Sequence, residues 1–215
     1  GWVAVGTANA FIVKDDAIFS TGAGPYPSWL RTEQEYENFV LRFEYKTEDW
    51  YEGGVLLHAP LHGPGSKMGF KIHLRHEQKA YGLRSPGAIY DAAAPRSIAN
   101  LPSGKWNYCE INCDWPSLRV TLNDELIHDI SMDTHDAFKH RLRRGFIGIQ
   151  NIGCRASFKN IKIRELPDQE KLWQPLFRSG MAGMHKQGQS DWSIANEVLT
   201  GKGKDGVAVT RAEFF

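Results

Sequence analysis

The chain has 215 residues, of which 41% are hydrophobic and 24% charged, and its formal net charge at pH 7 is +1. These values are ordinary for a soluble globular protein with one domain, or with one domain and an additional fragment. The near-neutral charge gives no electrostatic basis for binding nucleic acid or an anionic membrane, and no apolar run is long enough to span a bilayer.

Short segments that alternate between apolar and polar residues follow one another as far as residue 165, and Gly, Pro, Asn and Asp separate them. This period of two predicts strands. The expected strands span residues 11–13, 17–20, 28–32, 38–46, 55–58, 68–75, 106–113, 118–122, 126–130, 145–150 and 156–165.

Other segments are expected to be irregular or only briefly ordered. One helical turn is expected at residues 33–37 and a short helix within 131–144, while residues 80–90 are expected to hold a strand before a turn. We expect residues 38–46 to pair with the strand at Val55. The pattern as a whole predicts an all-β fold, a β-sandwich or jelly roll of two antiparallel sheets.

The segment 53–77 is the strongest candidate for carrying a polar site. Its second strand alternates between apolar side chains, which face the core, and the side chains of Lys71, His73 and Arg75 on the other face. All three can donate hydrogen bonds, and the imidazole titrates near neutral pH. The alternative interpretation is an ordinary solvated strand face.

The three cysteines suggest structural rather than redox or metal chemistry. Cys109 and Cys113 are four residues apart on one expected strand, about 13 Å at ~3.3 Å per residue, which is too far for a disulfide. Either could pair with Cys154, and the spacing indicates no zinc site. We expect all three to be buried, small apolar side chains.

After residue 166 the sequence changes in character. Residues 167–171 read as a linker, and the tail 172–215 resembles the beginning of the chain. Residues 11–18 align without a gap with 192–199, residues 32–36 align with 210–214, and Gly1 aligns with Gly183.

A tail of about 45 residues is too short to bury a core by itself. It is therefore expected to dock on the first domain, to exchange into a neighbouring chain, or to begin a second domain. Residues 172–177 have no counterpart before Gly1, and we predict that they fill an edge position of the first sandwich.

Several motifs occur in an order that resembles a known family. They include Trp29-Leu30-Arg31-Thr32, Gly53-Gly54-Val55, Gly104-Lys105-Trp106-Asn107 and Phe158-Lys159-Asn160-Ile161-Lys162-Ile163. Over residues 1–166 the chain resembles the 3-keto-disaccharide hydrolase domain family, a concanavalin-like sandwich of extracytoplasmic bacterial proteins. The tail resembles the front of a second copy. The resemblance implies a periplasmic or extracellular location.

The sequence departs from the family where polar residues are usual. Where the family usually has Asn-Ser-Gly-Ile, residues 52–55 of this chain are Glu-Gly-Gly-Val. The family's Phe-Leu-Arg is replaced by Leu-Leu-His at 56–58, and its Gln-Asp-His-Gly by Gln-Asn-Ile-Gly at 150–153. The next strand usually carries Glu, Gln and Asp on its polar face, and these positions are Lys71, His73 and Arg75 here. The predicted face is therefore basic rather than acidic.

The resemblance implies cleavage of a 3-keto glycoside by elimination and addition of water. Such a site needs a base for the C2 proton, a cation near the C3 oxygen and an acid for the leaving group. We predict His73 as the base, Lys71 or Arg75 as the cation and Tyr90 as the acid. The predicted ligand-binding residues are His58, Arg75, Glu52, Tyr51, Trp106 and Gln150.

The expected partner is an oligosaccharide or glycoside, without a metal ion or cofactor. Two other functions stay open at this point. One is a carbohydrate-binding domain without catalysis, and the other is a structural β-sandwich in a larger assembly. Self-association through the tail is a further expectation.

Overall fold

The computed structural model describes residues 1–24, 28–48, 50–167, 184–195, 198–205 and 207–210. The chain divides into two compact units, residues 1–167 and 168–215. In the described part of the chain, no helix has the length and apolar character needed to cross a membrane.

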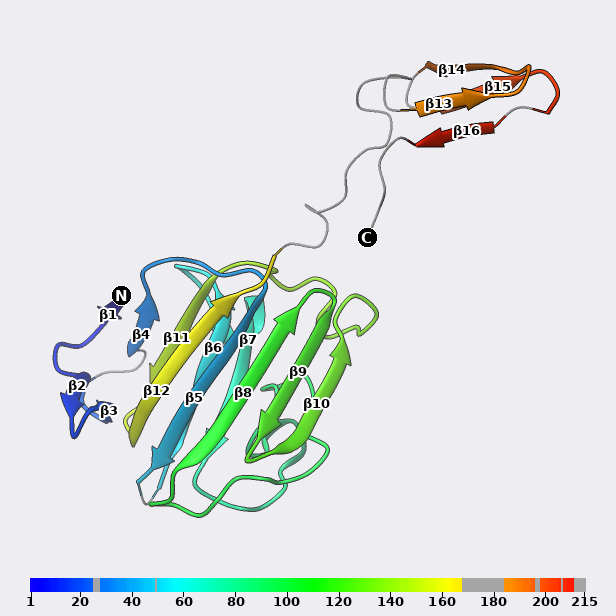
Figure 1. Ribbon diagram of the computed structural model, residues 1–215. Helices are drawn as coiled ribbons and strands as arrows, with labels where there is room; N and C mark the ends of the chain where they lie inside the picture. Colours follow the sequence, from blue (N-terminus) through cyan, green and yellow to red (C-terminus); the bar gives the residue numbers. More distant parts are fainter. Residues whose placement is uncertain (25–27, 49, 168–183, 196–197, 206, 211–215) are drawn as a thin grey trace. The chain divides into compact units, whose positions relative to one another are not determined.

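Unit 1 is a sandwich of two antiparallel sheets, which Figure 1 shows with the larger sheet in front. The five-stranded sheet has the order β1 (Trp2–Val5), β4 (Ser28–Thr32), β11 (Phe146–Asn151), β6 (Glu52–Ala59) and β7 (Phe70–Arg75). The seven-stranded sheet has the order β10 (Glu125–Ser131), β9 (Ser117–Leu122), β8 (Asn107–Asp114), β5 (Phe39–Thr47), β12 (Arg155–Glu165), β3 (Ala17–Thr21) and β2 (Phe11–Lys14). The predicted all-β sandwich is confirmed.

The core lies between the two sheets and follows from the alternation of residues along the strands. The apolar face of β5 packs against the apolar faces of β6 and β7 in one cluster of buried side chains. Among its members are Phe39, Leu41, Phe43, Tyr45, Val55, Leu57, Phe70, Ile72 and Leu74. Cys109, Cys113 and Cys154 are buried and free, and the prediction that they are buried is confirmed.

Some of the expected elements are wrong. β5 pairs with β8 and β12 and not with β6, because β5 and β6 belong to opposite sheets. A period of two shows which face of a strand is buried, but it does not identify the neighbouring strand.

The short irregular segments also differ from expectation. Residues 80–90 contain a 3-10 helix, η1 (Gly82–Arg84), and an isolated bridge at Ile89 instead of a strand. Residues 33–37 and 131–144 form bends and turns, and the short helix is α1 (Gly65–Met68), within the β6–β7 connection. The Gly and Pro residues in these segments interrupt regular secondary structure, but they do not determine which local structure follows.

Strand β6 departs from regular alternation at its C-terminal end. The pairing of β11 with β6 shifts register between Phe146 and Gly148, and His58 has a φ of 50°. Such a bulge turns the side chain away from the direction that alternation predicts. The His58 ring therefore lies in the core, with Nε2 2.8 Å from the Glu37 carbonyl oxygen and Nδ1 3.1 Å from that of Leu142.

Unit 2 contains two antiparallel pairs, β13 (Met184–Gln187) with β16 (Val207–Thr210) and β14 (Asp191–Ala195) with β15 (Val198–Lys202). Trp192 is opposite Gly201, as the aligned Phe11 is opposite Ser20 in unit 1.

The second pair of strands repeats unit 1 in the same way. Met184 is opposite Thr210, as the aligned Trp2 is opposite Thr32. The strand pairing of unit 2 thus follows that of unit 1 at both aligned positions, and the internal repeat stays a prediction. Residues 172–177, predicted to fill an edge position, lie outside the described residues.

We expect replacement of His58 by alanine to lower the free energy of unfolding by about 2–4 kcal/mol, because it leaves two buried carbonyl groups and a cavity in the core. Urea-induced unfolding measures this change. His62→Ala is the control, because His62 is exposed in the following loop. Equal stability of the two variants would contradict the role of the His58 ring in connecting the segments at Glu37 and Leu142.

Candidate functional site

The outer face of the five-stranded sheet has little side-chain bulk at its centre. In the sheet register Gln150 lies opposite Gly54, and Gly54 lies opposite His73. In the next outward-facing row Gly148 lies opposite Leu56, and Leu56 lies opposite Lys71. The two central strands therefore each contribute one glycine to this face.

These glycines leave space that two large side chains occupy. A Cβ atom at Gly148 would lie 2.4 Å from the Trp29 ring, and one at Gly54 would lie 2.7 Å from Lys71 Cγ. The Trp29 ring therefore lies over Gly148, and the Lys71 stem lies over Gly54. A larger residue at Gly148 would displace Trp29, and one at Gly54 would displace Lys71. Trp29 and Lys71 come from β4 and β7, on either side of the two central strands.

On the β7 side, the segment after η1 brings Tyr90 next to Lys71 and His73. The backbone N–H of Tyr90 donates to the Lys71 carbonyl oxygen at 2.9 Å, and that of His73 donates to the Ala88 carbonyl oxygen at 2.8 Å. Lys71 Nζ lies 3.6 Å from the centroid of the Tyr90 ring. The centroids of the His73 and Tyr90 rings are 5.0 Å apart.

His73 is covered on all sides and has 0% exposed area. Its Nδ1 lies 3.0 Å from the Arg84 carbonyl oxygen, and its Nε2 lies 3.3 Å from Glu52 Oε1. Burial lowers the pKa of His73 to about 3, and the charges of Lys71 and Arg75 act in the same direction. The ring is therefore neutral near pH 7, and its Nδ1–H donates to the Arg84 carbonyl.

Ion pairs link the charged groups around these rings. Arg75 Nη1 lies 3.3 Å from Glu52 Oε1, and its Nη2 lies 2.5 Å from Glu77 Oε2. Arg84 Nε lies 3.1 Å from Asp91 Oδ1.

Lys71 differs from these arginines, because it makes no salt bridge with any residue that the structure describes. Burial lowers its pKa to about 8, although the carboxylates of Glu52 and Asp91 favour the ammonium form. A substantial fraction of the Lys71 amine is therefore neutral at mildly alkaline pH.

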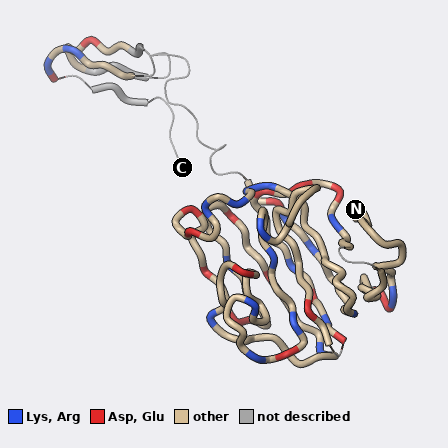
Figure 2. The backbone as a smooth tube through the Cα atoms, turned by 180° about the vertical axis from the view of Figure 1, so that it is seen from behind, with Lys and Arg blue, Asp and Glu red and all other residues tan. Residues whose placement is uncertain are grey.

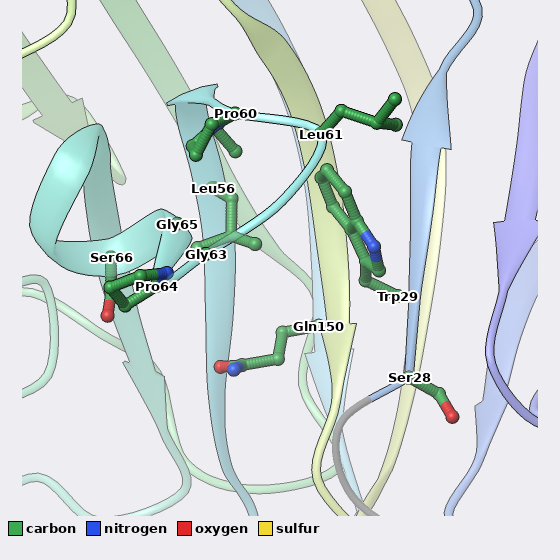
Figure 3. A pocket seen from close by; sticks show the side chains of 11 residues that line it. Ser28, Trp29, Leu56, Pro60, Leu61, Gly63, Pro64, Gly65, Ser66 and Gln150 are labelled. Carbon is green, nitrogen blue, oxygen red and sulfur yellow. The ribbon is translucent and has the colours of Figure 1, made fainter.

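A pocket of about 180 Å³ opens on the same face, on the other side of β6. We call it the Trp29 pocket. Figure 3 shows the Trp29 ring beside the loop at Pro60 and Leu61, while the Gln150 side chain extends over β6. The pocket is lined by Ser28, Trp29, Leu56, Ala59, Pro60, Leu61, Gly63, Pro64, Gly65, Ser66 and Gln150.

The structure brings together six of the predicted site residues. They are Lys71, His73, Tyr90, Arg75, Glu52 and, across Gly54, Gln150. Alternation along β7 and its pairing with β6 bring together Lys71, His73, Arg75 and Glu52, while β11 and the segment after η1 add Gln150 and Tyr90.

The other three predicted residues lie elsewhere. His58 is in the core because of the bulge in β6, and Tyr51 is also in the core with 0% exposed area. Trp106 lies at the seven-stranded sheet, its ring 5.0 Å from Lys46 Nζ and 4.2 Å from Lys159 Nζ. These three side chains therefore do not join Lys71, and their prediction as ligand-binding residues of the same site is wrong.

Sequence reasoning missed Trp29 and Arg84. Trp29 belongs to a motif that carried the family resemblance but was given no role in a site, and its role emerges only when Gly148 is seen to lie beneath its ring. Arg84 lies in a segment expected to be a strand, and no local pattern predicts that η1 folds over His73.

The described residues offer little basis for a metal or a polyanion. None of their His, Cys, Asp and Glu side chains form a group of three that could hold a metal ion. Over unit 1, acidic and basic positions are interspersed (Figure 2).

Comparisons with solved structures place the fold among sugar-related and galectin-like sandwiches. A "putative glycosyl hydrolase" from Parabacteroides distasonis is 20% identical, with a TM-score of 0.67 over 77% of this chain and 100% of its own. A carbohydrate-binding module from Bacillus subtilis is 15% identical, with a TM-score of 0.55 over 77% of this chain and 96% of its own.

A protein with a galectin-like fold from the same organism is 13% identical, with a TM-score of 0.52 over 76% of this chain and 89% of its own. At these identities the likeness concerns the fold alone. None of the curated protein sequences matches the chain. The model of the 3-keto-alpha-glucoside-1,2-lyase-like domain matches residues 1–164, and the chain therefore belongs to this family.

Proposed function

We propose that unit 1 binds a glycoside on the outer face of the five-stranded sheet and cleaves its 3-keto form outside the cytoplasm. The observation that carries this proposal is the buried Lys71 side chain, whose stem lies over Gly54 and whose pKa is lowered to about 8, on the same sheet face as the Trp29 pocket. Family membership and a solved structure titled as a glycosyl hydrolase give it further support.

The reaction is an elimination followed by addition of water. A base removes the C2 proton, which the C3 carbonyl acidifies, and the electron pair moves to the C3 oxygen as an enolate. The enolate then re-forms the carbonyl and a C1–C2 double bond, while the C1–oxygen bond breaks and the leaving oxygen takes a proton. Water adds across the double bond, so the net reaction is hydrolysis.

Lys71 is the base in this proposal. A pKa of about 8 gives it a neutral fraction close to physiological pH, which general base catalysis requires. Its side chain also retains exposed area, since the residue is 7% exposed, whereas His73 is 0% exposed. A group that is fully enclosed does not reach a ligand, so the predicted base, His73, becomes a positioning residue.

Arg84 supplies the cation near the C3 oxygen, and Tyr90 supplies the acid for the leaving group. The Arg84 side chain is 59% exposed, and its guanidinium carbon lies 5.5 Å from the centroid of the Tyr90 ring. It is the cation that can approach an enolate oxygen without leaving the site. The half-buried Tyr90 hydroxyl is the donor for the leaving oxygen.

The second candidate function is sugar binding without catalysis. It is favoured by the ion pairs within the cluster, where Arg75 holds Glu52 and Glu77 and Arg84 holds Asp91. Groups that neutralise one another form a rigid binding surface, and an indole such as Trp29 can stack on the apolar face of a sugar. A solved carbohydrate-binding module shares the fold.

We expect aglycone release from 3-keto glucosides and none from the unoxidised glucosides, because only the C3 carbonyl acidifies the C2 proton. Chromatography of the products measures both reactions across a panel of α and β anomers. Lys71→Met should lower kcat at least 100-fold, on the order of the contribution of a general base.

Lys67→Met is the matched control, because Lys67 is exposed on α1 in the same chain region. Cleavage of unoxidised glucosides at the same rate, or an unchanged kcat in Lys71→Met, would refute the mechanism. Binding of the panel without release would establish the second candidate function.

We expect kcat/KM to rise with pH through a midpoint of about 8 and to level off above it. The sign follows from the role of Lys71, because only the neutral amine accepts a proton, and protonation removes the base as pH falls. Initial rates with one 3-keto glucoside between pH 6 and 10 test this. A rate that declines above pH 8 would instead show that the ammonium form is the active one.

The positioning role of His73 predicts a change in this pH profile. His73→Ala should admit water beside Lys71 and move the midpoint upward, because burial is the largest cause of the lowered pKa. His73→Asn keeps a side-chain N–H for the Arg84 carbonyl and should leave the midpoint nearer 8. The same midpoint in wild type and His73→Ala would argue against this role.

A further inference from the structure

The Trp29 pocket has mainly apolar walls. Its sides are formed by the Trp29 ring and by Pro60, Leu61 and Pro64, and Leu56 contributes to the lining from β6. Its polar lining side chains are Ser28, Ser66 and Gln150, of which Ser28 and Gln150 already interact with other residues of the protein. A ligand with a hydroxyl group on nearly every carbon would lose its hydrogen bonds to water here without full replacement.

The volume of the pocket corresponds to a single ring. It measures about 180 Å³. A cavity of about 150 Å³ with aliphatic and aromatic walls is known to hold one benzene molecule. The pocket is thus suited to one aromatic or alicyclic ring and is too small for an extended chain of sugars.

The position of the pocket relates it to the proposed reaction. Leu56, in its lining, lies directly opposite Lys71 in the pairing of β6 with β7. Adjacent strands are about 4.8 Å apart, so a ring in the pocket and a sugar over Lys71 would be neighbours in one ligand. The glycosidic oxygen would then lie above β6, between Leu56 and Lys71.

We propose that the Trp29 pocket binds the leaving group, and that it selects a ring-sized apolar aglycone in preference to a second sugar. This inference rests on the proposed function, because only that reaction makes the bound aglycone a leaving group. The binding preference itself does not depend on catalysis. The substrate class is therefore the aryl or alicyclic glycosides in their 3-keto form.

The test uses the full chain and unoxidised ligands first. Calorimetry compares phenyl glucoside with methyl glucoside and with a glucose disaccharide, each as both anomers. We expect phenyl glucoside to bind at least tenfold more tightly than either, from the apolar area that the ring buries. Rates with the 3-keto forms of the same ligands should follow the same order.

Leu61→Asp places a charge in the wall of the pocket and should abolish the preference for phenyl glucoside over methyl glucoside. Leu61 is 49% exposed, so the substitution should be tolerated by the fold. Leu126→Asp is the control, because Leu126 is 39% exposed on β10 of the opposite sheet. Thermal unfolding of both variants checks that they are folded.

The outcomes separate this inference from the proposed function. A phenyl preference that Leu61→Asp removes supports the pocket assignment, even if no 3-keto glycoside is cleaved and the proposed reaction fails. Equal or tighter binding of the disaccharide overturns the assignment, as does a preference that survives in Leu61→Asp. Absence of measurable binding of every ligand also overturns it.

Discussion

The outer face of the five-stranded sheet depends on the two glycines of its central strands. Glycine within a strand costs conformational entropy and contributes no packing, so its presence at both Gly54 and Gly148 weakens the sheet locally. The opposite face of the same strands carries Val55 and Ile149 in the buried core. That core stabilises the strands and allows their outer face to be used for Lys71 and Trp29 instead of for packing.

The burial of Lys71 is the second constraint. It disfavours the charged ammonium form and so lowers the stability of the folded state. An ammonium group away from water favours losing its proton, and the Tyr90 ring face and the nearby carboxylates only partly offset this. Arg75 offsets this cost through its ion pair with Glu52, whereas the Arg84 side chain is 59% exposed and does not incur it. A lysine in this position destabilises the folded state, which is the usual relation between a reactive group and its scaffold.

The sequence predicts those parts of the structure that depend on local alternation. The core face of β5 and the outward direction of Lys71 and His73 are of this kind. The neighbours of β5, the inward rotation of His58 and the approach of η1 to His73 depend on contacts between distant segments. A single residue of bulge reverses the direction of a side chain, so alternation placed His58 on the wrong face.

A comparison of aligned residues indicates whether unit 2 could contain the site proposed for unit 1. Trp29 is opposite Val5 in β1 and β4, and the corresponding pair in unit 2 is Val207 opposite Gln187. The strand pairing is therefore repeated, but the indole that forms one side of the Trp29 pocket is replaced by an aliphatic residue. Because the proposed aglycone site needs that ring surface, the repeat preserves the scaffold without preserving the site. Similarity between the two units thus argues for a shared fold, while the proposed glycoside cleavage is assigned to unit 1.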